Sequence, residues 1–101
     1  MSCPFCLIVE KTKPAKFVEG YDFDGFVAFF DKRPQLRSHV IVCSRTHIEA
    51  ERATTRKNTA TRLLMASWEA ARVLKLDKHR VIVNTGLGRV PHLHAHLISK
   101  G

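Results

Sequence analysis

Apolar and polar positions along the chain predict several short strands. Three are runs of β-branched or aromatic residues bounded by polar or turn-forming ones: Phe26–Phe30, His39–Cys43 and Val81–Val83. Pro91 opens a last strand, at a position where its missing N–H does no harm. Phe17–Glu19 is a weaker strand candidate, and these segments together predict a sheet of short strands.

A helical period replaces the strand pattern between about residues 59 and 76. Positions at i, i+3, i+4 and i+7 form one stripe: Leu63, Leu64, Ser67, Trp68, Ala71 and Leu74. A helix packed on a sheet accounts for Trp68 and its neighbours. A second, short helix or turn is expected at the end of Cys3–Val9. Because strands dominate around one main helix, the sequence predicts an α+β domain with an antiparallel sheet. No repeat or linker divides the chain, so a single domain over residues 1–101 is expected.

Composition narrows the possible classes of protein. Hydrophobic residues make up 45% of the 101 residues, which excludes a disordered chain. The apolar runs are too short to cross a bilayer, and no secretory signal is visible, so a cytoplasmic protein without a membrane partner is expected. The formal charge of +8 favours polyanionic partners such as nucleotides, nucleic acid or acidic lipid. The basic residues are spread out with little aromatic alternation, so nucleic acid is only weakly indicated.

Three histidines occupy alternate positions of the last predicted strand. His92, His94 and His96 then share one face, and the apolar residues between them share the other. Neighbouring imidazoles lie roughly 6.5–7 Å apart along such a strand. A solvent-facing edge strand explains this pattern poorly, because histidine has no special strand preference. Imidazole suits both zinc binding and catalysis near neutral pH, so the pattern predicts a metal cluster or a catalytic face.

Cys3 and Cys6 form a C-x-x-C pair whose thiolates can reach one ion. A thioredoxin-like redox pair is the rival interpretation, but that motif follows a strand, and no strand can precede residue 3. Zinc is therefore favoured, with two histidines completing four ligands. The spacing leaves the choice open among the remaining histidines: His39, His47, His79 and the three of the last strand. Cys43 is expected to be a small buried residue, and His79 a surface residue.

The ordered set of motifs resembles the histidine triad (HIT) family, over nearly the whole chain. The pattern His-φ-His-φ-His-φ-φ at residues 92–98, with φ apolar, looks like the family's signature. Further segments are similar to family motifs: Cys3-x-x-Cys6, Ala28-Phe29-Phe30-Asp31 with Pro34, Ser38–Ile48, and Val81–Asn84 with Gly86.

This resemblance implies an antiparallel α+β fold, a homodimer and an enzyme that acts on nucleotides. Members hydrolyse or transfer nucleoside monophosphate groups, and the expected substrates are nucleoside phosphoramidates or dinucleoside polyphosphates. His94 corresponds to the nucleophile, which attacks the α-phosphorus and forms a covalent nucleotidyl-imidazole. His96 corresponds to the phosphate-contacting histidine and Asn84 to the asparagine near phosphate and ribose. Asp31 corresponds to the acid that accepts the ribose hydroxyls, with Phe29 near the base.

In zinc-bearing members of the family, the metal ligands correspond to Cys3, Cys6, His47 and His92. Four protein ligands leave no open position, so the resemblance implies structural Zn²⁺. Such an ion would hold the N-terminus against the catalytic strand.

The sequence departs from the family pattern in two places. Where the family often carries Gly-Gln-Ser or Gly-Gln-Thr, residues 86–91 contain neither glutamine nor a hydroxyl. Arg89 is expected to contact substrate there and supply charge, but an arginine cannot donate a proton at neutral pH. Lys32 and Arg33 follow Asp31, and two cations there favour extra phosphates.

Two further interpretations compete with the enzyme. The altered segment 86–91 and the +8 charge motivate a non-catalytic nucleotide- or nucleic-acid-binding module on the same fold. A zinc-ribbon-like structural module is weaker, because histidines at alternate strand positions cannot all converge on one ion.

Overall fold

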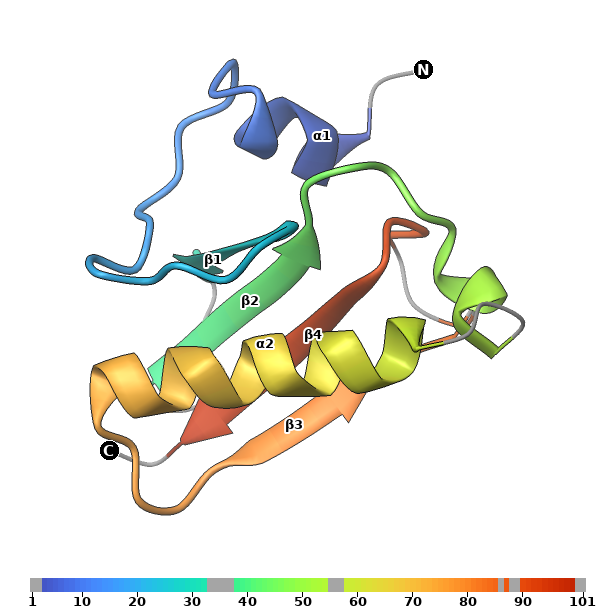
Figure 1. Cartoon of the computed structure of the whole chain (residues 1–101). Helices are drawn as coiled ribbons and strands as arrows, with labels where there is room; N and C mark the ends of the chain where they lie inside the picture. Colours follow the sequence, from blue (N-terminus) through green and yellow to red (C-terminus); the bar gives the residue numbers. More distant parts are fainter. Residues whose placement is uncertain (1–2, 33–37, 55–57, 86, 88–89, 100–101) are drawn as a thin grey trace.

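The computed structural model describes residues 3–32, 38–54, 58–85, 87 and 90–99. It contains a four-stranded antiparallel sheet crossed by one long helix (Figure 1). The strands are β1 (Phe26–Phe30), β2 (Ser38–Ser44), β3 (Arg80–Val83) and β4 (His94–Ser99), in the spatial order β1-β2-β4-β3. The helices are α1 (Pro4–Val9), the 3₁₀ helix η1 (Ala50–Thr54) and α2 (Thr59–Leu74). This arrangement confirms the predicted α+β class.

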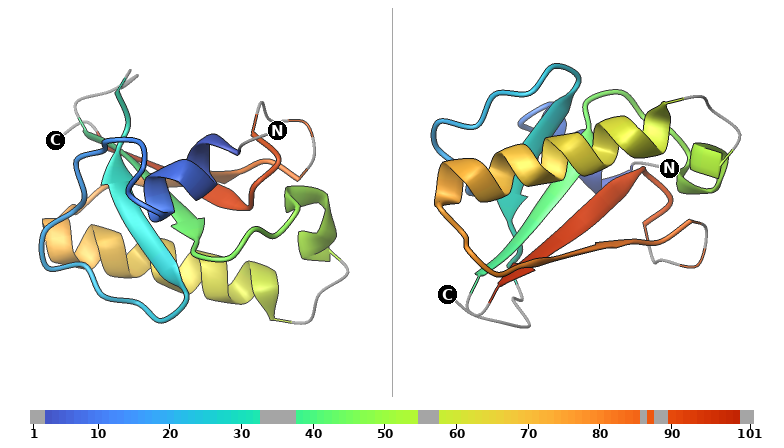
Figure 2. Two further views of the ribbon diagram at one scale, coloured as in Figure 1. Left: turned by 90° about the horizontal axis from the view of Figure 1, so that it is seen from above. Right: turned by 60° about the horizontal axis from the view of Figure 1, so that its bottom comes forward.

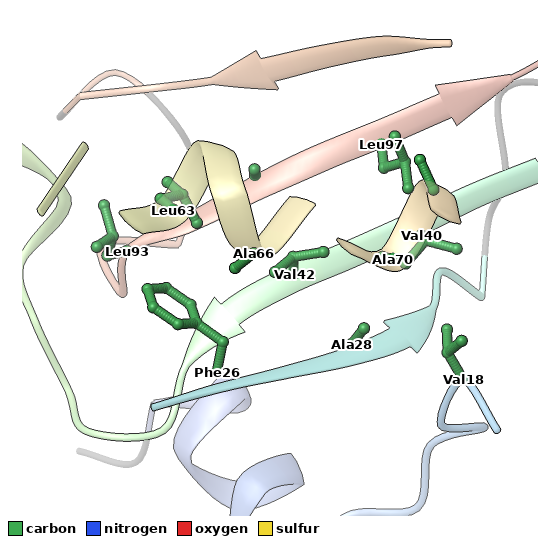
Figure 3. Close-up of a cluster of buried hydrophobic side chains, with 12 residues drawn as sticks. Val18, Phe26, Ala28, Val40, Val42, Leu63, Ala66, Ala70, Leu93 and Leu97 are labelled. Atoms are coloured by element: carbon green, nitrogen blue, oxygen red, sulfur yellow. The ribbon is translucent and has the colours of Figure 1, made fainter. Parts of the chain in front are cut away.

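Side chains of the sheet alternate between two apolar clusters, as the period of two requires. One cluster lies under α2 and joins small and branched residues (Figure 3): Val18, Phe26, Ala28, Val40, Val42, Leu63, Ala66, Ala70, Ala71, Leu93, Ala95 and Leu97. The other lies under α1 and consists of Phe5, Ile8, Val27, Phe29, Ile41 and Cys43. The two helices therefore cover opposite faces of the sheet, with α2 in front and α1 behind in the right view of Figure 2.

Most predicted elements are confirmed, with small shifts at their ends. The strand Phe26–Phe30 has the predicted bounds, and β2 and β3 are longer than predicted at one or both ends. The helix ends at Leu74 instead of residue 76, because Lys75 adopts a left-handed conformation with φ 57°. The predicted strand at Phe17 is only an isolated bridge to Phe29.

The last strand begins later than predicted. It starts at His94 and not at Pro91, and His92 forms an isolated bridge with Glu49. The cause is a change of partner, because Leu93 donates its N–H to the carbonyl of Ile48 and not to a neighbouring strand. The chain remains extended from His92 onward, so the alternation of side chains is kept.

The predicted burial of one flank of α2 is wrong. Leu63 and Ser67 are buried as expected, but Trp68 is 55% exposed and Leu64 is 38% exposed. A helix on a sheet buries only a limited stripe, and the alanines of α2 occupy the rest of it. Among the described residues, no helix combines the length and apolarity that crossing a bilayer requires.

Candidate functional site

The histidine strand is an inner strand of the sheet, with both of its edges hydrogen-bonded. His94 lies opposite Cys43 of β2, and His96 lies between Ile41 of β2 and Ile82 of β3. Pairing on both sides fixes the backbone that carries the two histidines. His94 is 4% exposed, which rules out the solvent-face interpretation of the pattern.

His94 has one defined tautomer. Its Nδ1 lies 2.7 Å from the carbonyl oxygen of His92, and a carbonyl only accepts, so Nδ1 carries the hydrogen. The lone pair is therefore on Nε2. Burial lowers the pKa of His94, and the bond to the carbonyl offsets this only in part. The ring is thus neutral at pH 7 and suited to nucleophilic attack through Nε2.

Phe5 of α1 connects this histidine to an apolar cavity. Its ring packs edge-on against His94, with centroids 4.8 Å apart, and against Phe29 of β1 at 5.6 Å. The cavity has a volume of about 400 Å³, and Phe5, Phe29 and Ile41 line it together with Asp31 and the exposed Lys32. It combines an apolar wall for a planar ring with the carboxylate of Asp31 and the ammonium groups of Lys13 and Lys32.

The structure places Asp31 beside a histidine that the sequence analysis considered only as a metal ligand. His39 is 3% exposed, its Nδ1 lies 3.4 Å from Asp31 Oδ2, and its Nε2 lies 2.8 Å from His96 Nδ1. Alternation along β2 places His39 on the same face as Ile41 and Cys43. The sequence did not show that β2 pairs with the last strand, so these contacts of His39 could not be predicted.

Four predicted ligands come together at one end of the sheet. The ligand atoms of Cys3, Cys6, His47 and His92 all lie within 4.8 Å of one another. The sulfur-to-Nδ1 distances are 3.4 Å for Cys3–His92, 3.4 Å for Cys6–His47 and 3.5 Å for Cys6–His92. Sulfur and nitrogen ligands of one tetrahedral zinc ion are separated by about 3.5 Å, so the geometry fits.

The hydrogen bonds around this cluster prepare both histidines for a metal. His92 Nε2–H donates to the carbonyl of Ser44 at 2.6 Å, and His47 Nε2–H donates to Glu49 at 3.0 Å. Both Nδ1 atoms therefore present lone pairs to the thiols. Burial and the neighbouring Cys3 raise the pKa of Cys6, so the thiol stays protonated at neutral pH without a cation. The other candidates lie elsewhere, since His39 contacts His96 and His79 is exposed.

Residues 10–101 match the family model of the HIT domain. The chain belongs to the HIT family. No protein with a curated description matches its sequence.

Solved HIT structures have the same fold as this chain. A Zn-bound histidine triad family protein from Mycobacterium smegmatis is 29% identical, with a TM-score of 0.81 over 100% of this chain and 76% of that one. A HIT family hydrolase from Clostridium thermocellum is 26% identical, with a TM-score of 0.79 over 97% and 90%. A histidine triad protein from Clostridium difficile is 25% identical, with a TM-score of 0.80 over 98% and 90%.

The remaining predicted HIT residues lie near the site or outside the described part of the chain. Asn84 is half-buried and directly follows β3. Val83 lies opposite Ala95, so one further residue brings Asn84 level with His94. Arg89 and Arg33 lie outside the described residues. Cys43 is fully buried as expected, and burial raises the pKa of its thiol to about 12, which makes it unreactive.

Proposed function

We propose that residues 1–101 form one HIT domain that binds a nucleotide and cleaves the bond from its α-phosphorus to a leaving group. The tautomer of His94 is the observation that carries this proposal, because it leaves Nε2 with a lone pair on a ring that packs against Phe5 of the cavity wall. The expected substrates are nucleoside phosphoramidates and dinucleoside polyphosphates. The similar Clostridium thermocellum protein is a HIT family hydrolase, which supports hydrolysis.

The cavity suits the nucleoside. Phe29 and Phe5, which line the cavity, would contact a base, adenine being the expected one, and the Asp31 carboxylate would accept ribose hydroxyls. Lys32 adds a cation at the same cavity, which suits phosphate groups. His96 and Asn84 are assigned to the phosphate because both lie next to or level with His94.

The reaction proceeds in two displacements at phosphorus. His94 Nε2 forms a bond to the α-phosphorus while the bond to the leaving group breaks, and the leaving group takes up a proton from solvent. Water then attacks the same phosphorus and releases a proton to solvent, the P–N bond breaks, and nucleoside monophosphate leaves. The neutral ring needs no deprotonation before the first step.

Trapping of the intermediate tests this mechanism, with denaturation at alkaline pH because a phosphorus–nitrogen bond to imidazole is hydrolysed in acid. After mixing with adenosine phosphoramidate and rapid denaturation, the intact mass of the chain is expected to rise by one adenylyl group, and peptide mapping is expected to place it on residue 94. The exposed His79 serves as the internal comparison. A chain that turns over substrate but never carries the adduct would contradict the covalent mechanism.

We propose Zn²⁺ as the ion for the thiol–histidine cluster. The four donors of Cys3, Cys6, His47 and His92 fit a closed tetrahedral site, and the similar Mycobacterium smegmatis protein is Zn-bound. Zinc bound there would be structural and would keep both thiols deprotonated. The chain's three cysteines are free, which suits the reducing cytoplasm.

A homodimer is proposed across the open edge of the sheet. Arg62 of α2 bonds to the carbonyl of Asp24, next to β1, so Leu64 and Trp68 point toward the β3 side at 100° per residue. Within the described part of the chain β3 pairs only with β4, and Val83 is 41% exposed. Leu64 and Trp68 form an apolar flank beside this edge. In a two-fold dimer, the edge and the apolar flank of one copy would pack against the same surface of the second copy.

Trp68→Glu is expected to weaken this dimer by at least about tenfold, because it places a charge in the apolar flank. Sedimentation velocity across a concentration series measures the shift. Glu19→Lys changes the charge at an exposed position beside β1, at the opposite edge of the sheet, and is expected to leave assembly unchanged. A wild-type chain that stays monomeric at the highest concentration would contradict the proposal.

A non-catalytic binding module is the second candidate. The observation that favours it is the lack of a hydroxyl or amide side chain in residues 86–91, together with the charge of +8. It predicts nucleotide or oligonucleotide binding that weakens with added salt and no adduct in the trapping experiment.

A further inference from the structure

Three charged side chains line the nucleotide cavity, and two of them are lysines that no step of the reaction uses. Asp31, Lys13 and Lys32 are its charged lining residues within the described part of the chain, and the rest of that wall is apolar. Lys13 is half-buried and Lys32 is exposed. Among the described residues, neither ammonium group forms a salt bridge. The cavity therefore carries two positive charges against one negative charge.

Lys32 lies at the end of the cavity that is distant from the nucleophile. It follows Asp31, whose backbone N–H donates to the carbonyl of His39 at 2.9 Å. On β2, His39 stands four residues from Cys43, which lies opposite His94. A rise of about 3.4 Å per residue separates these two levels of the sheet by about 13 Å.

Lys13 reaches the same end of the cavity from another segment. After α1 the chain turns back, and the N–H of Lys13 donates to the carbonyl of Leu7 at 3.1 Å. Three residues later, the carbonyl of Lys16 accepts the N–H of Phe30 at 2.9 Å, at the end of β1. Pro14, between these two anchors, also lines the cavity. Two separate segments thus bring an ammonium group to the end of the cavity that holds Asp31.

The position of these charges fits the nucleoside and not the leaving group. Displacement at phosphorus expels the leaving group on the side opposite the attacking His94 Nε2. The phosphates of a polyphosphate leaving group therefore begin near the level of His94, about 13 Å along the sheet from the level of Asp31. The ribose hydroxyls, by contrast, are assigned to Asp31 itself, the residue before Lys32. Ligand groups that meet the two lysines are thus carried by the nucleoside.

A phosphate on the ribose accounts for both ammonium groups. Lysine has only donors, so the N6 amino group of adenine, which also donates, cannot accept from Lys13 or Lys32. A ribose phosphate presents several oxygens that accept from both lysines, and its charge balances the excess of positive charge in the cavity. The remaining ribose hydroxyl can still donate to Asp31.

We propose that Lys13 and Lys32 select nucleotides that carry a second phosphate on the 2′ or 3′ hydroxyl of the ribose. This inference rests on the proposed function, because it takes the nucleoside to lie in the cavity. The reacting atom is still the 5′-phosphorus, and the lysines determine which nucleotide is bound. The substrate class is then a nucleoside bisphosphate whose 5′-phosphorus carries the leaving group.

Calorimetry with a small set of nucleotides tests the position of the second phosphate. The wild type is expected to bind adenosine 3′,5′-bisphosphate or adenosine 2′,5′-bisphosphate at least about tenfold more tightly than AMP, and the tighter of the two identifies the hydroxyl. ADP also has two phosphate groups, but both are on the 5′ side, and it is expected to gain less than about threefold over AMP. GMP tests whether the lysines bind a base carbonyl instead.

Lysine variants test whether these two side chains carry the preference. In Lys13→Gln and in Lys32→Gln, the ratio of Kd for AMP to Kd for the preferred bisphosphate is expected to fall to about threefold or less. Lys16→Gln is the matched control from the same segment as Lys13. The Lys16 ammonium lies 5.4 Å from the ring centroid of Phe30, which packs against the cluster under α2, and Lys16 does not line the cavity. Its ratio is expected to stay at the wild-type value.

Turnover gives a second readout of the same preference. The 5′-phosphoramidate of the preferred bisphosphate is expected to have a KM about tenfold lower than adenosine phosphoramidate, with kcat within about threefold. The reason is that contacts distant from the reacting phosphorus stabilise the bound substrate and the transition state equally. Lys32→Gln is expected to cancel most of this advantage in KM.

The outcomes separate this inference from the proposed function. Equal Kd values for AMP and both bisphosphates, or a preference that survives in both lysine variants, would overturn the ribose phosphate site, while the His94 adduct would still support the proposed reaction. Tighter binding of GMP than of AMP, with no gain from either bisphosphate, would assign the lysines to the base and would also overturn the site. A wild type that binds a bisphosphate through these lysines but never forms the adduct would support the site and overturn the proposed reaction.

Discussion

His94→Ala is expected to abolish turnover while nucleotide still binds. The residue supplies the lone pair that attacks phosphorus, and His92 cannot replace it because its Nδ1 faces the thiols and its Nε2–H donates to Ser44. Removing a nucleophile from a unit of this kind lowers kcat by at least about a thousandfold. The cavity residues Phe29 and Asp31 are untouched, so Kd for AMP should change less than about threefold.

The measurement is chromatographic detection of AMP released from adenosine phosphoramidate and from diadenosine tetraphosphate. Because the His94 ring also packs against Phe5, the alanine variant leaves a cavity, and His94→Asn fills more of it without restoring a nucleophile. His79→Ala tests for a general effect of losing a histidine. Release of AMP by both His94 variants at the wild-type rate would refute the assignment, and the faster wild-type substrate would indicate which substrate class the site prefers.

The hydrophobic pattern predicted the strands and which side chains of each strand lie on the same face of the sheet, because side chains of a strand alternate with a period of two. The burial of Leu93, Ala95 and Leu97 under α2 follows directly from their alternation with the histidines. The exposure of Trp68 did not follow, because helical spacing identifies an apolar side but not how much of it the sheet covers. The four-residue metal cluster was assigned through family resemblance, since spacing left several histidines open.

The contact between His39 and His96 could not be predicted from the pattern of either strand alone. The two residues are 57 positions apart, and their contact arises from the antiparallel register of β2 and β4. The placement of Phe5 against His94 is of the same kind, because α1 packs on the sheet from the opposite end of the sequence. Tertiary pairing of this type determines which side chains meet and which tautomers they adopt, whereas the sequence determines only which side chains are present.

Removal of the metal is expected to destabilise the protein and weaken nucleotide binding together. Helix α1 has six residues and no side-chain cap, so it cannot persist alone. Burial of Phe5 and Ile8 and the thiol–histidine cluster hold it against the sheet. A bound ion contributes about 4 kcal/mol to the free energy of unfolding when free metal exceeds its Kd a thousandfold. For a chain of this length, that corresponds to a fall in Tm of more than about 15 °C after chelation.

Loss of the metal is expected to affect His94, the nucleophile, in two ways. His92 presents Nδ1 to the thiols, and its carbonyl accepts the hydrogen of His94 Nδ1, so a loosened His92 no longer fixes the tautomer. Phe5, between the two cysteines in sequence, packs against both His94 and the nucleotide cavity. Kd for AMP, measured by calorimetry on the chelated protein, is therefore expected to rise about tenfold or more.

Cysteine variants distinguish the effect of losing the metal from the effect of losing a thiol side chain. Cys6→Ala is expected to lose the stoichiometric zinc, measured by metal analysis, and to show the lower Tm without chelator. Cys43→Ala removes the one cysteine outside the cluster and should retain one zinc per chain and its metal-dependent Tm. If Cys6→Ala kept its zinc, or if chelation left both Tm and AMP binding unchanged, the cluster would not be what joins α1 to the catalytic strand. Loss of zinc from Cys6→Ala together with weaker AMP binding would instead establish that the segment Cys3–Cys6 forms part of the nucleotide site only when the ion is in place.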